Sequence, residues 1–375
     1  MTAPPGHERR YEPSVDDADP AWDEFVESHP TAHFEQTAVW GNIQGLRGWT
    51  ASRLKVLEAG KIVAGAQVLE RPVGRFGRIG YVFRGPLYAS SDRSNLGPSL
   101  NALVAHARRR GLYYLAVVPP YFSEQDRPVY ERHGFFHGPP ELPPSSSMLA
   151  TAFLDLSRSD EELVRDMPRM TRRNVRYGQE RGLEAVDGSR ADIPDFSRLV
   201  VELCRRRGTT LNIPTGPFLE ALWDRLAPRG IARLIMIRHE GTSIAGLMVF
   251  RYGAWCRAWR AGWSGEQAEK RPTELMYWKA LQWARTVGCR HYDFGGIDSD
   301  IARELADGRE RDLEAIRQRC SVTSYKLGFG GAIVPPVERF CLFPGRLTGP
   351  LLRRAVPWLL GSKRFRMLLN RRAAA

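Results

Sequence analysis

The stretches RLKVLEAGKIVAGAQVLER (53–71) and RLIMIRHEGTSIAGLMVFRY (233–252) follow one pattern. In each, apolar and polar residues alternate, a turn containing glycine follows, and a second apolar stretch carries Ala-Gly. Alternation with a period of two on both sides of a glycine turn is typical of a β-hairpin. The sequence therefore predicts two similar hairpins, far apart in one chain of 375 residues.

The elements that follow the two hairpins also match. An aromatic strand comes next, RIGYVFRGPLY (78–88) in the first half and WCRAWRAGWS (255–264) in the second. A helical stretch then runs into an apolar strand, at 100–120 and at 275–296. This order resembles the GNAT acyltransferase fold. We therefore expect an α/β protein of two tandem GNAT-like domains, each with a mixed, mainly antiparallel sheet.

A stretch rich in proline and serine, HGPPELPPSSSMLATAFLDL (137–156), is typical of a linker that enters a new strand. We expect a first domain at 1–150 and a second at 151–334. The second domain is expected to carry an arginine-rich helix and a strand that includes Lys326. After Gly331 the chain ends in a basic, apolar tail. Residues 335–375 are expected to pack back on the first domain, or to touch a membrane or nucleic acid.

The formal net charge of +13 favours a polyanionic partner, although an arginine-rich proteome would also produce it. The five cysteines form no CxxC pair, so we expect no zinc ribbon, no disulfide framework and a reducing, cytoplasmic location. The N-terminus has no apolar signal segment, and no run is long enough to span a bilayer. No metal-binding motif is present, and no metal is expected.

Arginines recur with helical spacing in LVRDMPRMTRRNVRYGQERG (163–182). Arg165, Arg169, Arg172, Arg173 and Arg176 fall on one face of a 3.6-residue helix, which Pro168 either kinks or begins. Five like charges on one face suit a phosphate backbone, or they form a solvated surface. The Gln/Arg-x-x-Gly-x-Gly/Ala loop by which GNAT enzymes hold coenzyme A is missing. The nearest stretch, QERGLE (179–184), ends in an acid that would oppose a phosphate.

With these features, residues 30–332 resemble the FemABX family of aminoacyl-tRNA-dependent transferases. The resemblance rests on HFEQTAVWGNIQ (33–44), YVFRGPLY (81–88), TRRNVRYGQERGLEA (171–185), HYDFGGID (291–298) and YKLGFGG (325–331). It implies twin GNAT-like domains that move an amino acid from tRNA onto an amine, with aminoacyl-tRNA as co-substrate and no cofactor. The acceptor implied is a peptidoglycan precursor or a specialised metabolite such as a peptide-like antibiotic intermediate.

The resemblance also implies roles for single residues. The ammonium group of Lys326, with Tyr325 beside it, would stabilise the oxyanion of the tetrahedral intermediate. The glycines at 328, 330 and 331 would let the backbone approach the ester or the terminal ribose. Asp293 would orient the acceptor amine or accept its proton; equally, it could cap the glycine turn that follows. Arg169, Arg172, Arg173 and Arg176 are the expected contacts to tRNA or to an acceptor phosphate.

The expected acceptor cleft departs from the peptidoglycan-type pattern. Where such members carry a lysine four residues after Trp40, this chain has Gln44, and a second expected basic residue falls on Asn212. Losing both would remove the charge pair that holds a diphosphate, although Arg84 could substitute. The cleft candidates are Trp40, Gln44, Tyr81, Arg84, Asn212 and Trp259. A coenzyme A-dependent N-acyltransferase and a non-catalytic protein that binds RNA or a membrane surface remain as alternatives.

Overall fold

The structure is a computed structural model that describes residues 9–31, 33–73, 77–89, 93–138, 150–209, 211, 214–345 and 348–361, with residues 356–361 described by their backbone alone. The chain divides into two compact units. Unit 1 comprises Met1–Ser147 and Val337–Ala375, and unit 2 comprises Met148–Pro336.

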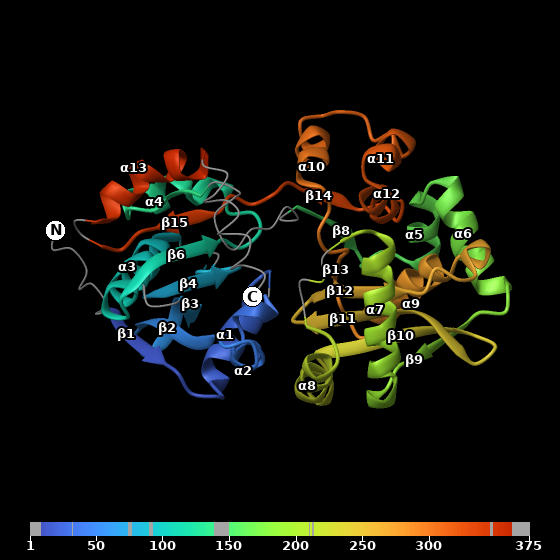
Figure 1. The fold of residues 1–375 in the computed structure, drawn as a ribbon, viewed down its shortest axis with the longest axis horizontal. Helices are drawn as coiled ribbons and strands as arrows, with labels where there is room; N and C mark the ends of the chain where they lie inside the picture. Colours follow the sequence, from blue (N-terminus) through green and yellow to red (C-terminus); the bar gives the residue numbers. More distant parts are fainter. Residues whose placement is uncertain are drawn as a thin grey trace. The chain divides into compact units, whose positions relative to one another are not determined.

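Unit 1 is a mixed sheet with helices on both faces (Figure 1). Its strands are β1 (Arg9–Ser14), β2 (Thr50–Glu58), β3 (Lys61–Pro72), β4 (Arg78–Phe83), β5 (Leu87–Tyr88), β6 (Leu112–Val118), β7 (Phe136–His137) and β15 (Phe340–Leu342). Its α-helices in the described ranges are α1 (Pro20–Ser28), α2 (Ala38–Gly45), α3 (Leu96–Arg109), α4 (Arg127–Arg132) and α13 (Thr348–Gly361). Short 3-10 turns are η1 (Phe34–Gln36), η2 (Arg93–Asn95) and η3 (Glu124–Asp126).

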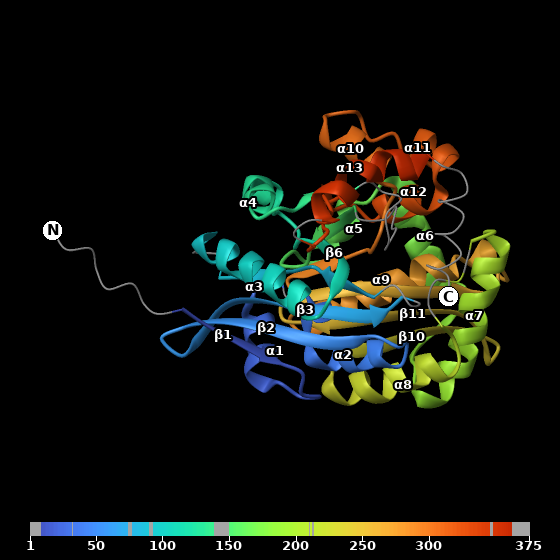
Figure 2. The same cartoon turned by 60° about the vertical axis from the view of Figure 1, so that its left-hand side comes forward.

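The strand order in unit 1 is β1-β2-β3-β4-β6-β15-β7, with β5 paired to β3. Strands β4 and β6 are parallel, and the other described neighbours are antiparallel. Helix α3 covers one face through Leu100 and Leu103, whereas α1 and α2 cover the other (Figure 2). Because β15 pairs with β6, the segment after Pro336 contributes a strand to this sheet.

Unit 2 repeats this plan. Its strands are β8 (Thr151–Asp155), β9 (Glu184–Asp187), β10 (Ala232–His239), β11 (Thr242–Tyr252), β12 (Trp255–Trp263), β13 (His291–Asp293) and β14 (Ala332–Val334). Its helices are α5 (Asp160–Asp166), α6 (Arg169–Glu180), α7 (Ile193–Arg206), α8 (Pro217–Leu226), α9 (Pro272–Thr286), α10 (Ser299–Ala306), α11 (Leu313–Arg319) and α12 (Ser321–Leu327), with 3-10 turns η4 (Arg190–Asp192), η5 (Ala227–Arg229) and η6 (Ala268–Lys270).

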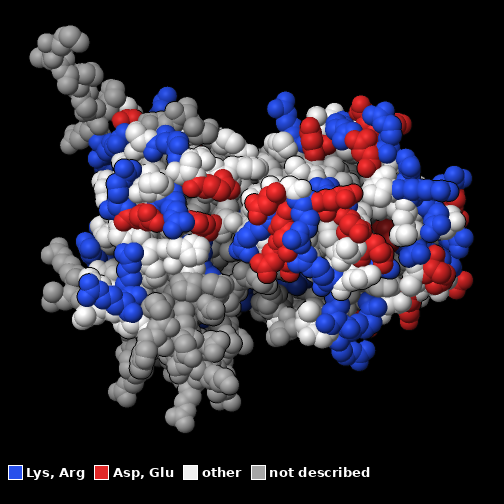
Figure 3. All heavy atoms as spheres, turned by 90° about the horizontal axis from the view of Figure 1, so that it is seen from above, with Lys and Arg blue, Asp and Glu red and all other residues white. Residues whose placement is uncertain are grey.

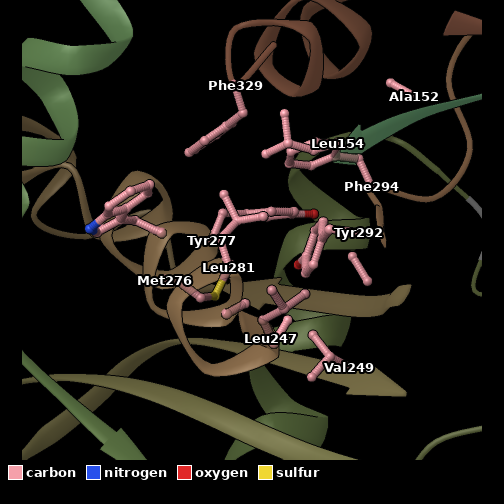
Figure 4. Close-up of a cluster of buried hydrophobic side chains, with 14 of the residues drawn as sticks. Ala152, Leu154, Leu247, Val249, Met276, Tyr277, Leu281, Tyr292, Phe294 and Phe329 are labelled. Carbon is pink, nitrogen blue, oxygen red and sulfur yellow. The ribbon is translucent and has the colours of Figure 1, made fainter. Parts of the chain in front are cut away.

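The strand order in unit 2 is β14-β8-β13-β12-β11-β10-β9, in which β12 and β13 are parallel. Helices α5, α6 and α9 pack on one face, and α7 packs on the other. Figure 4 shows how α9 fills the core: Met276, Tyr277 and Leu281 face Leu247 and Val249 of β11. Phe329, which follows α12, joins the same cluster.

The predicted GNAT-like repeat is confirmed. The hairpins β2–β3 and β10–β11 are antiparallel, and each is followed by a strand, a helix and a parallel crossover strand. The glycines of the two Ala-Gly pairs, Gly65 and Gly246, have the same structural role. A Cβ on Gly65 would lie 2.7 Å from the ring of Trp22 on α1, and one on Gly246 would lie 2.9 Å from the ring of Phe196 on α7. In both hairpins, glycine lets an aromatic ring from a covering helix touch the strand.

Candidate active site

The two parallel strands of unit 2 part at the centre of its sheet. The pairing of β12 with β13 ends at Arg257 and Asp293. Directly afterwards, the register of β12 against β11 shifts, because Val249 pairs with Ala258 and Met248 with Arg260. Trp259 is the extra residue of this β-bulge, and a bulge bends its strand. In α/β sheets, ligands bind beyond the carboxyl ends of parallel strands, so this point is the first place to look for a site.

Asp293 is the last residue of β13, and it is fully buried. Its Oδ1 accepts hydrogen bonds from Thr151 Oγ1 and, at 2.7 Å, from the backbone N–H of Gly295. Its Oδ2 accepts one from Arg257 Nε at 2.6 Å. Both carboxylate oxygens are therefore engaged within the protein. This geometry matches the turn-capping interpretation of Asp293. The carboxylate therefore positions the turn formed by residues 294–296, the FGG turn, rather than accepting a proton.

Lys326 reaches the same turn from α12. Its Nζ donates a 2.7 Å hydrogen bond to the carbonyl oxygen of Gly296. The side chain is half-buried, and burial lowers the pKa of Lys326 from 10.5 to about 8. The negative charge of Asp293 opposes this shift, whereas the positive charges of Arg207 and Arg260 add to it. The ammonium group thus lies in a cluster of cations that is balanced in part by one buried carboxylate.

The expectation that Lys326 lies on a strand is wrong, because the residue lies in the last turn of helix α12. The alternating apolar residues Tyr325, Leu327 and Phe329 imitate a strand pattern. The buried helical positions are instead Thr323, Ser324 and Leu327, and the Ser324 hydroxyl donates a 2.7 Å hydrogen bond to the Leu313 carbonyl. Tertiary contacts with α11 therefore decide the local structure.

Tyr325 points into the core rather than toward Gly296. Its ring lies edge-on to Tyr277 and Phe329, with centroid distances of 5.5 Å to each. Burial raises the pKa of Tyr325 well above its usual value, so its hydroxyl stays protonated. This position gives Tyr325 a supporting place beneath the helix that carries Lys326.

The glycines after Lys326 pack against protein. A Cβ on Gly328 would lie 2.7 Å from Thr171 Oγ1 of α6, and one on Gly331 would lie 2.6 Å from the Phe153 carbonyl of β8. Gly331 also has a φ of +96°, which favours glycine. The glycines at these two positions thus allow α6 and β8 to approach closely.

Helix α6 places the arginines beside this centre. Arg169, Arg172, Arg173 and Arg176 are all exposed, and the helix packs inward through Val175 and Gly178. The prediction that five arginines share one face of a single helix is wrong for Arg165. Arg165 belongs to the separate helix α5, and α6 begins after Pro168. The contact between Thr171 and Gly328 joins the first turn of α6 to the end of α12, so the arginines border the Lys326 helix.

The N-terminus of α9, the crossover helix between β12 and β13, is where a GNAT fold would hold a coenzyme A pyrophosphate. Here a carboxylate occupies that first turn. Glu274 is buried, and it accepts hydrogen bonds from Asn174 Nδ2 of α6 at 3.0 Å and from Thr273 Oγ1 at 2.9 Å. A Cβ on Gly178 would lie 3.1 Å from the Arg271 carbonyl, so α6 also covers this end. A buried negative charge under a packed helix opposes a pyrophosphate.

The expected acceptor residues fall in two units. Trp40, Gln44, Tyr81 and Arg84 belong to unit 1, and Trp259 belongs to unit 2. Asn212 lies outside the described residues. In unit 2, Trp259 stacks on Phe250 at 4.8 Å.

In unit 1, Arg84 follows β4, at the carboxyl end of the parallel pair β4–β6. It is 3% exposed, and its guanidinium lies 3.5 Å from the ring centroid of Tyr121. Tyr81 lies on β4, and burial raises its pKa, which the nearby charges of Arg84 and Arg339 oppose. Trp40 is half-buried and edge-on to Phe34 at 5.1 Å.

Gln44 is buried at the end of α2, and its side-chain oxygen accepts a 3.5 Å hydrogen bond from Arg47. It therefore belongs to the packing of α2, whereas Tyr81 and Arg84 lie together near the end of the parallel strands.

Several residues of these sites were not identified from the sequence. In unit 2 they are Thr151, Arg257 and Arg260, and in unit 1 the buried Arg339. Their places depend on which strands become neighbours, because β8, which carries Thr151, pairs with β13 across a gap of well over 100 residues. Arg207 is a further site residue, the last of three consecutive arginines at 205–207. It is exposed at the carboxyl end of α7, and its positive charge lowers the pKa of Lys326.

Two tandem sheets of this kind, each with a parallel crossover pair, define a GNAT-like transferase fold. A family model for the acetyltransferase (GNAT) domain matches residues 165–303. The FemAB family model matches residues 19–212, which is more than half of the chain. The chain belongs to the FemAB family.

Similar proteins agree with this placement. The chain is 25% identical over 234 residues to a Lipid II:glycine glycyltransferase of Staphylococcus saprophyticus, covering 59% of this chain and 55% of that one. It is 24% identical over 228 residues to the protein of the same description from Staphylococcus aureus, covering 58% and 52%. The chain thus spans about half the length of these relatives.

Solved structures extend the likeness of the fold. The crystal structure of FemX matches with a TM-score of 0.75 and 19% identity, covering 89% of this chain and 96% of that one. L-PGS from Bacillus licheniformis matches with a TM-score of 0.56 and 13% identity, covering 96% and 99%.

Proposed function

We propose that the protein is an aminoacyltransferase that moves an amino acid from aminoacyl-tRNA onto an amino group of an acceptor, forming an amide bond. The observation that carries the proposal is the ammonium group of Lys326, held on the Gly296 carbonyl where β12 and β13 part. The relatives named Lipid II:glycine glycyltransferase support a peptidoglycan precursor as the acceptor. A peptide-like metabolite is the second acceptor class.

The reaction needs no covalent enzyme intermediate, because the ester of aminoacyl-tRNA is already activated. The acceptor nitrogen attacks the ester carbonyl carbon, and the carbonyl electrons move onto its oxygen. Collapse of this tetrahedral species forms the C–N bond and breaks the C–O bond to the terminal ribose. The proton lost by the amine balances the one gained by the departing ribose hydroxyl.

Lys326 acts at the step where charge develops. Its Nζ carries three donors, of which one is used by the Gly296 carbonyl, so two remain for the ester oxygen. One well-placed donor at an oxyanion lowers the activation free energy by about 2.7–4 kcal/mol. Asp293 holds the FGG turn in place through Gly295, and its negative charge favours the ammonium form of Lys326.

The four exposed arginines of α6 supply a surface for the tRNA backbone. Figure 3 shows basic side chains interspersed with acidic ones over one face of the protein, so net charge alone does not define such a surface. Helix α6 is different, because it holds four arginines and the single acid Glu180. The first turn of α6 contacts Gly328, directly after the helix that carries Lys326. A tRNA bound to α6 would therefore bring its aminoacylated end toward the ammonium group.

Unit 1 has buried basic residues of its own that suit an acceptor. Arg84 and Arg339 bring two buried positive charges near Tyr81, which suits a phosphate on the acceptor. Arg84 would then bind the acceptor phosphate in place of the lysine that Gln44 replaces. We place the reaction in the cytoplasm, where charged tRNA is found.

Coenzyme A is a poorer candidate donor, because Glu274 and α6 occupy the N-terminus of α9. A non-catalytic binding protein would use the α6 arginines, but it would have no need for a half-buried lysine on a glycine carbonyl.

The test is a transfer assay with the purified full-length chain. Transfer RNA charged with radiolabelled glycine, alanine or serine is supplied with a UDP-linked or a lipid-linked muramyl pentapeptide, and acetyl-CoA serves as the competing donor. We expect label to move from tRNA to acceptor with the wild-type chain and not with Lys326→Met. Transfer from acetyl-CoA alone, or equal transfer by Lys326→Met, would overturn the proposal.

A further inference from the structure

Helix α13 in unit 1 has a stretch of exposed residues that no described part of the unit covers. Pro350, Leu351, Leu352, Arg353 and Arg354 are all exposed. Five consecutive residues make more than one turn, so the exposed surface extends around the helix there. Leu351 is 67% exposed and Leu352 is 37% exposed. Adjacent exposed leucines are costly in water unless something else covers them.

The amino end of α13 is fixed to the body of unit 1. The backbone N–H of Gly349 donates a 2.8 Å hydrogen bond to the Gly345 carbonyl. Arg108 of α3 donates a 3.2 Å hydrogen bond from Nε to the Pro344 carbonyl, just ahead of the helix. The guanidinium of Arg353 lies 5.3 Å from the ring centroid of Phe136 on β7. The uncovered turn is therefore presented on an ordered support.

The segment of sequence that contains this turn has charge of one sign. From residue 339 to residue 375 the sequence contains no aspartate or glutamate. The same stretch contains the basic residues Arg339, Arg346, Arg353, Arg354, Lys363, Arg364, Arg366, Arg371 and Arg372. Apolar residues are interleaved with them, including Trp358 in the second half of α13. This composition is complementary to a surface whose outer layer is negatively charged and whose inner layer is apolar.

We propose that α13 is a docking surface for an anionic lipid bilayer, with Leu351 and Leu352 in the headgroup region and Arg353 and Arg354 on the lipid phosphates. Helices that lie in a bilayer interface combine exposed apolar residues with Lys and Arg in this way. RNA would use the arginines but would leave the two leucines exposed to water. Within the described ranges, no helix is long and apolar enough to cross a membrane, so the contact is peripheral.

The proposal does not depend on the chemistry at Lys326. If the proposed function also holds, docking through α13 would bring the transferase to acceptors that are carried on a lipid and would favour them over soluble ones.

The test is co-sedimentation of the full-length chain with vesicles, without tRNA or acceptor. Vesicles of phosphatidylcholine containing phosphatidylglycerol are compared with vesicles of phosphatidylcholine alone, over a salt series. We expect binding to the anionic vesicles only, weakened by salt. Each Lys or Arg near such a surface strengthens binding about fivefold, so Arg353→Glu with Arg354→Glu should weaken it at least about tenfold.

Leu351→Asp with Leu352→Asp should weaken binding to a similar extent, because it removes the apolar contact. The matched control is Arg10→Glu with Arg229→Glu, which changes the same net charge at two other exposed positions and should keep most of the binding. All substituted side chains are on the surface, so thermal unfolding should be unchanged. Failure of the wild-type chain to bind anionic vesicles, or binding by both α13 variants that equals that of wild type, would overturn the proposal.

Binding to uncharged tRNA tests the remaining alternative, in which α13 is an RNA-binding surface. If the α13 variants lose tRNA binding and retain vesicle binding, α13 is an RNA surface and the proposal is wrong. Because the sedimentation assay involves no transfer reaction, its outcome is independent of whether the chain is an aminoacyltransferase.

Discussion

Lys326 and Gly296 are joined by a 2.7 Å hydrogen bond from Nζ to the backbone oxygen, although they lie 30 positions apart. The bond ties the end of α12 to the turn that follows β13. Gly295, the neighbouring residue, is held by the buried Asp293 through its N–H. The ammonium group is therefore held on a turn that the buried carboxylate itself fixes. A fixed cation can stabilise developing charge without reorganising during the reaction.

Removing the Lys326 ammonium should abolish most of the transfer activity. For Lys326→Met we expect the single-turnover rate of aminoacyl transfer to fall about 10²–10³-fold, which is the effect of losing one oxyanion donor. The affinity for charged tRNA should change little. Lys61→Met, at the exposed start of β3, is the matched control and should behave as wild type. A well-folded Lys326→Met protein with normal turnover would exclude the role.

The pKa of Lys326 predicts a limit on activity at alkaline pH. Since burial lowers this pKa to about 8, the ammonium form dominates below pH 8 and is lost as the pH rises through 8. The rate should therefore fall above about pH 8, after correction for spontaneous ester hydrolysis. Lys326→Arg keeps its charge over this range, so its residual activity should show no such fall. An identical alkaline limb in both proteins would assign it to another group.

The same shift fixes the sign of a stability effect. The unfolded chain binds a proton at Lys326 up to about pH 10.5, whereas the folded chain releases it near pH 8. The contribution of Lys326 to the free energy of unfolding is thus lowest below pH 8, and it rises between pH 8 and 10.5. Urea unfolding measures this effect. The free energy of unfolding of wild type minus that of Lys326→Met should rise between pH 8 and pH 10.5.

How much of this follows from the sequence depends on the range of the contacts involved. The hairpins β2–β3 and β10–β11 were predictable because alternation and a glycine turn are local signals. Helix α12 was not, since its seven residues are short and are stabilised by packing on α11. The partners of Asp293 were equally hidden. Thr151 and Arg257 meet it only after β8 and β12 have paired on either side of β13.

Asp293 should matter for stability as well as for the site. Asp293→Asn removes the charge that pairs with Arg257 in the buried interior, and breaking a buried pair costs about 3 kcal/mol or more. The pKa of Lys326 should also fall, because its opposing negative charge is lost. Urea unfolding measures the first effect, and the pH profile of transfer measures the second.

The control for Asp293→Asn is the same substitution at Asp300, whose pair with Arg303 is exposed on α10. An exposed pair contributes less than about 1 kcal/mol, so Asp300→Asn should change little. Equal losses of stability in the two variants would contradict the structural role assigned to Asp293.

The α6 arginines should govern tRNA binding and its salt dependence. For Arg172→Ala with Arg173→Ala we expect weaker binding of charged tRNA and a log–log salt slope that is smaller by about 1.8, if each contacts one phosphate. The turnover rate at saturating tRNA should change little. Arg132→Ala with Arg229→Ala removes the same charge at other exposed positions and should keep the wild-type slope. An unchanged slope in the α6 variant would move the RNA surface elsewhere.

Gly295 tests whether the FGG turn must approach β12 closely. Its φ is +73°, and a Cβ there would lie 2.9 Å from the Ala258 carbonyl and 3.7 Å from Lys326 Nζ. Gly295→Ala should lose transfer activity, because the turn must shift away from both groups. Gly288→Ala is the matched control, since Gly288 also has a positive φ of +80° but has open space around its Cβ position. It should cost only about 1–2 kcal/mol of backbone strain and keep the activity of wild type. If Gly295→Ala retains full activity, the close approach of the FGG turn to β12 is not required for transfer.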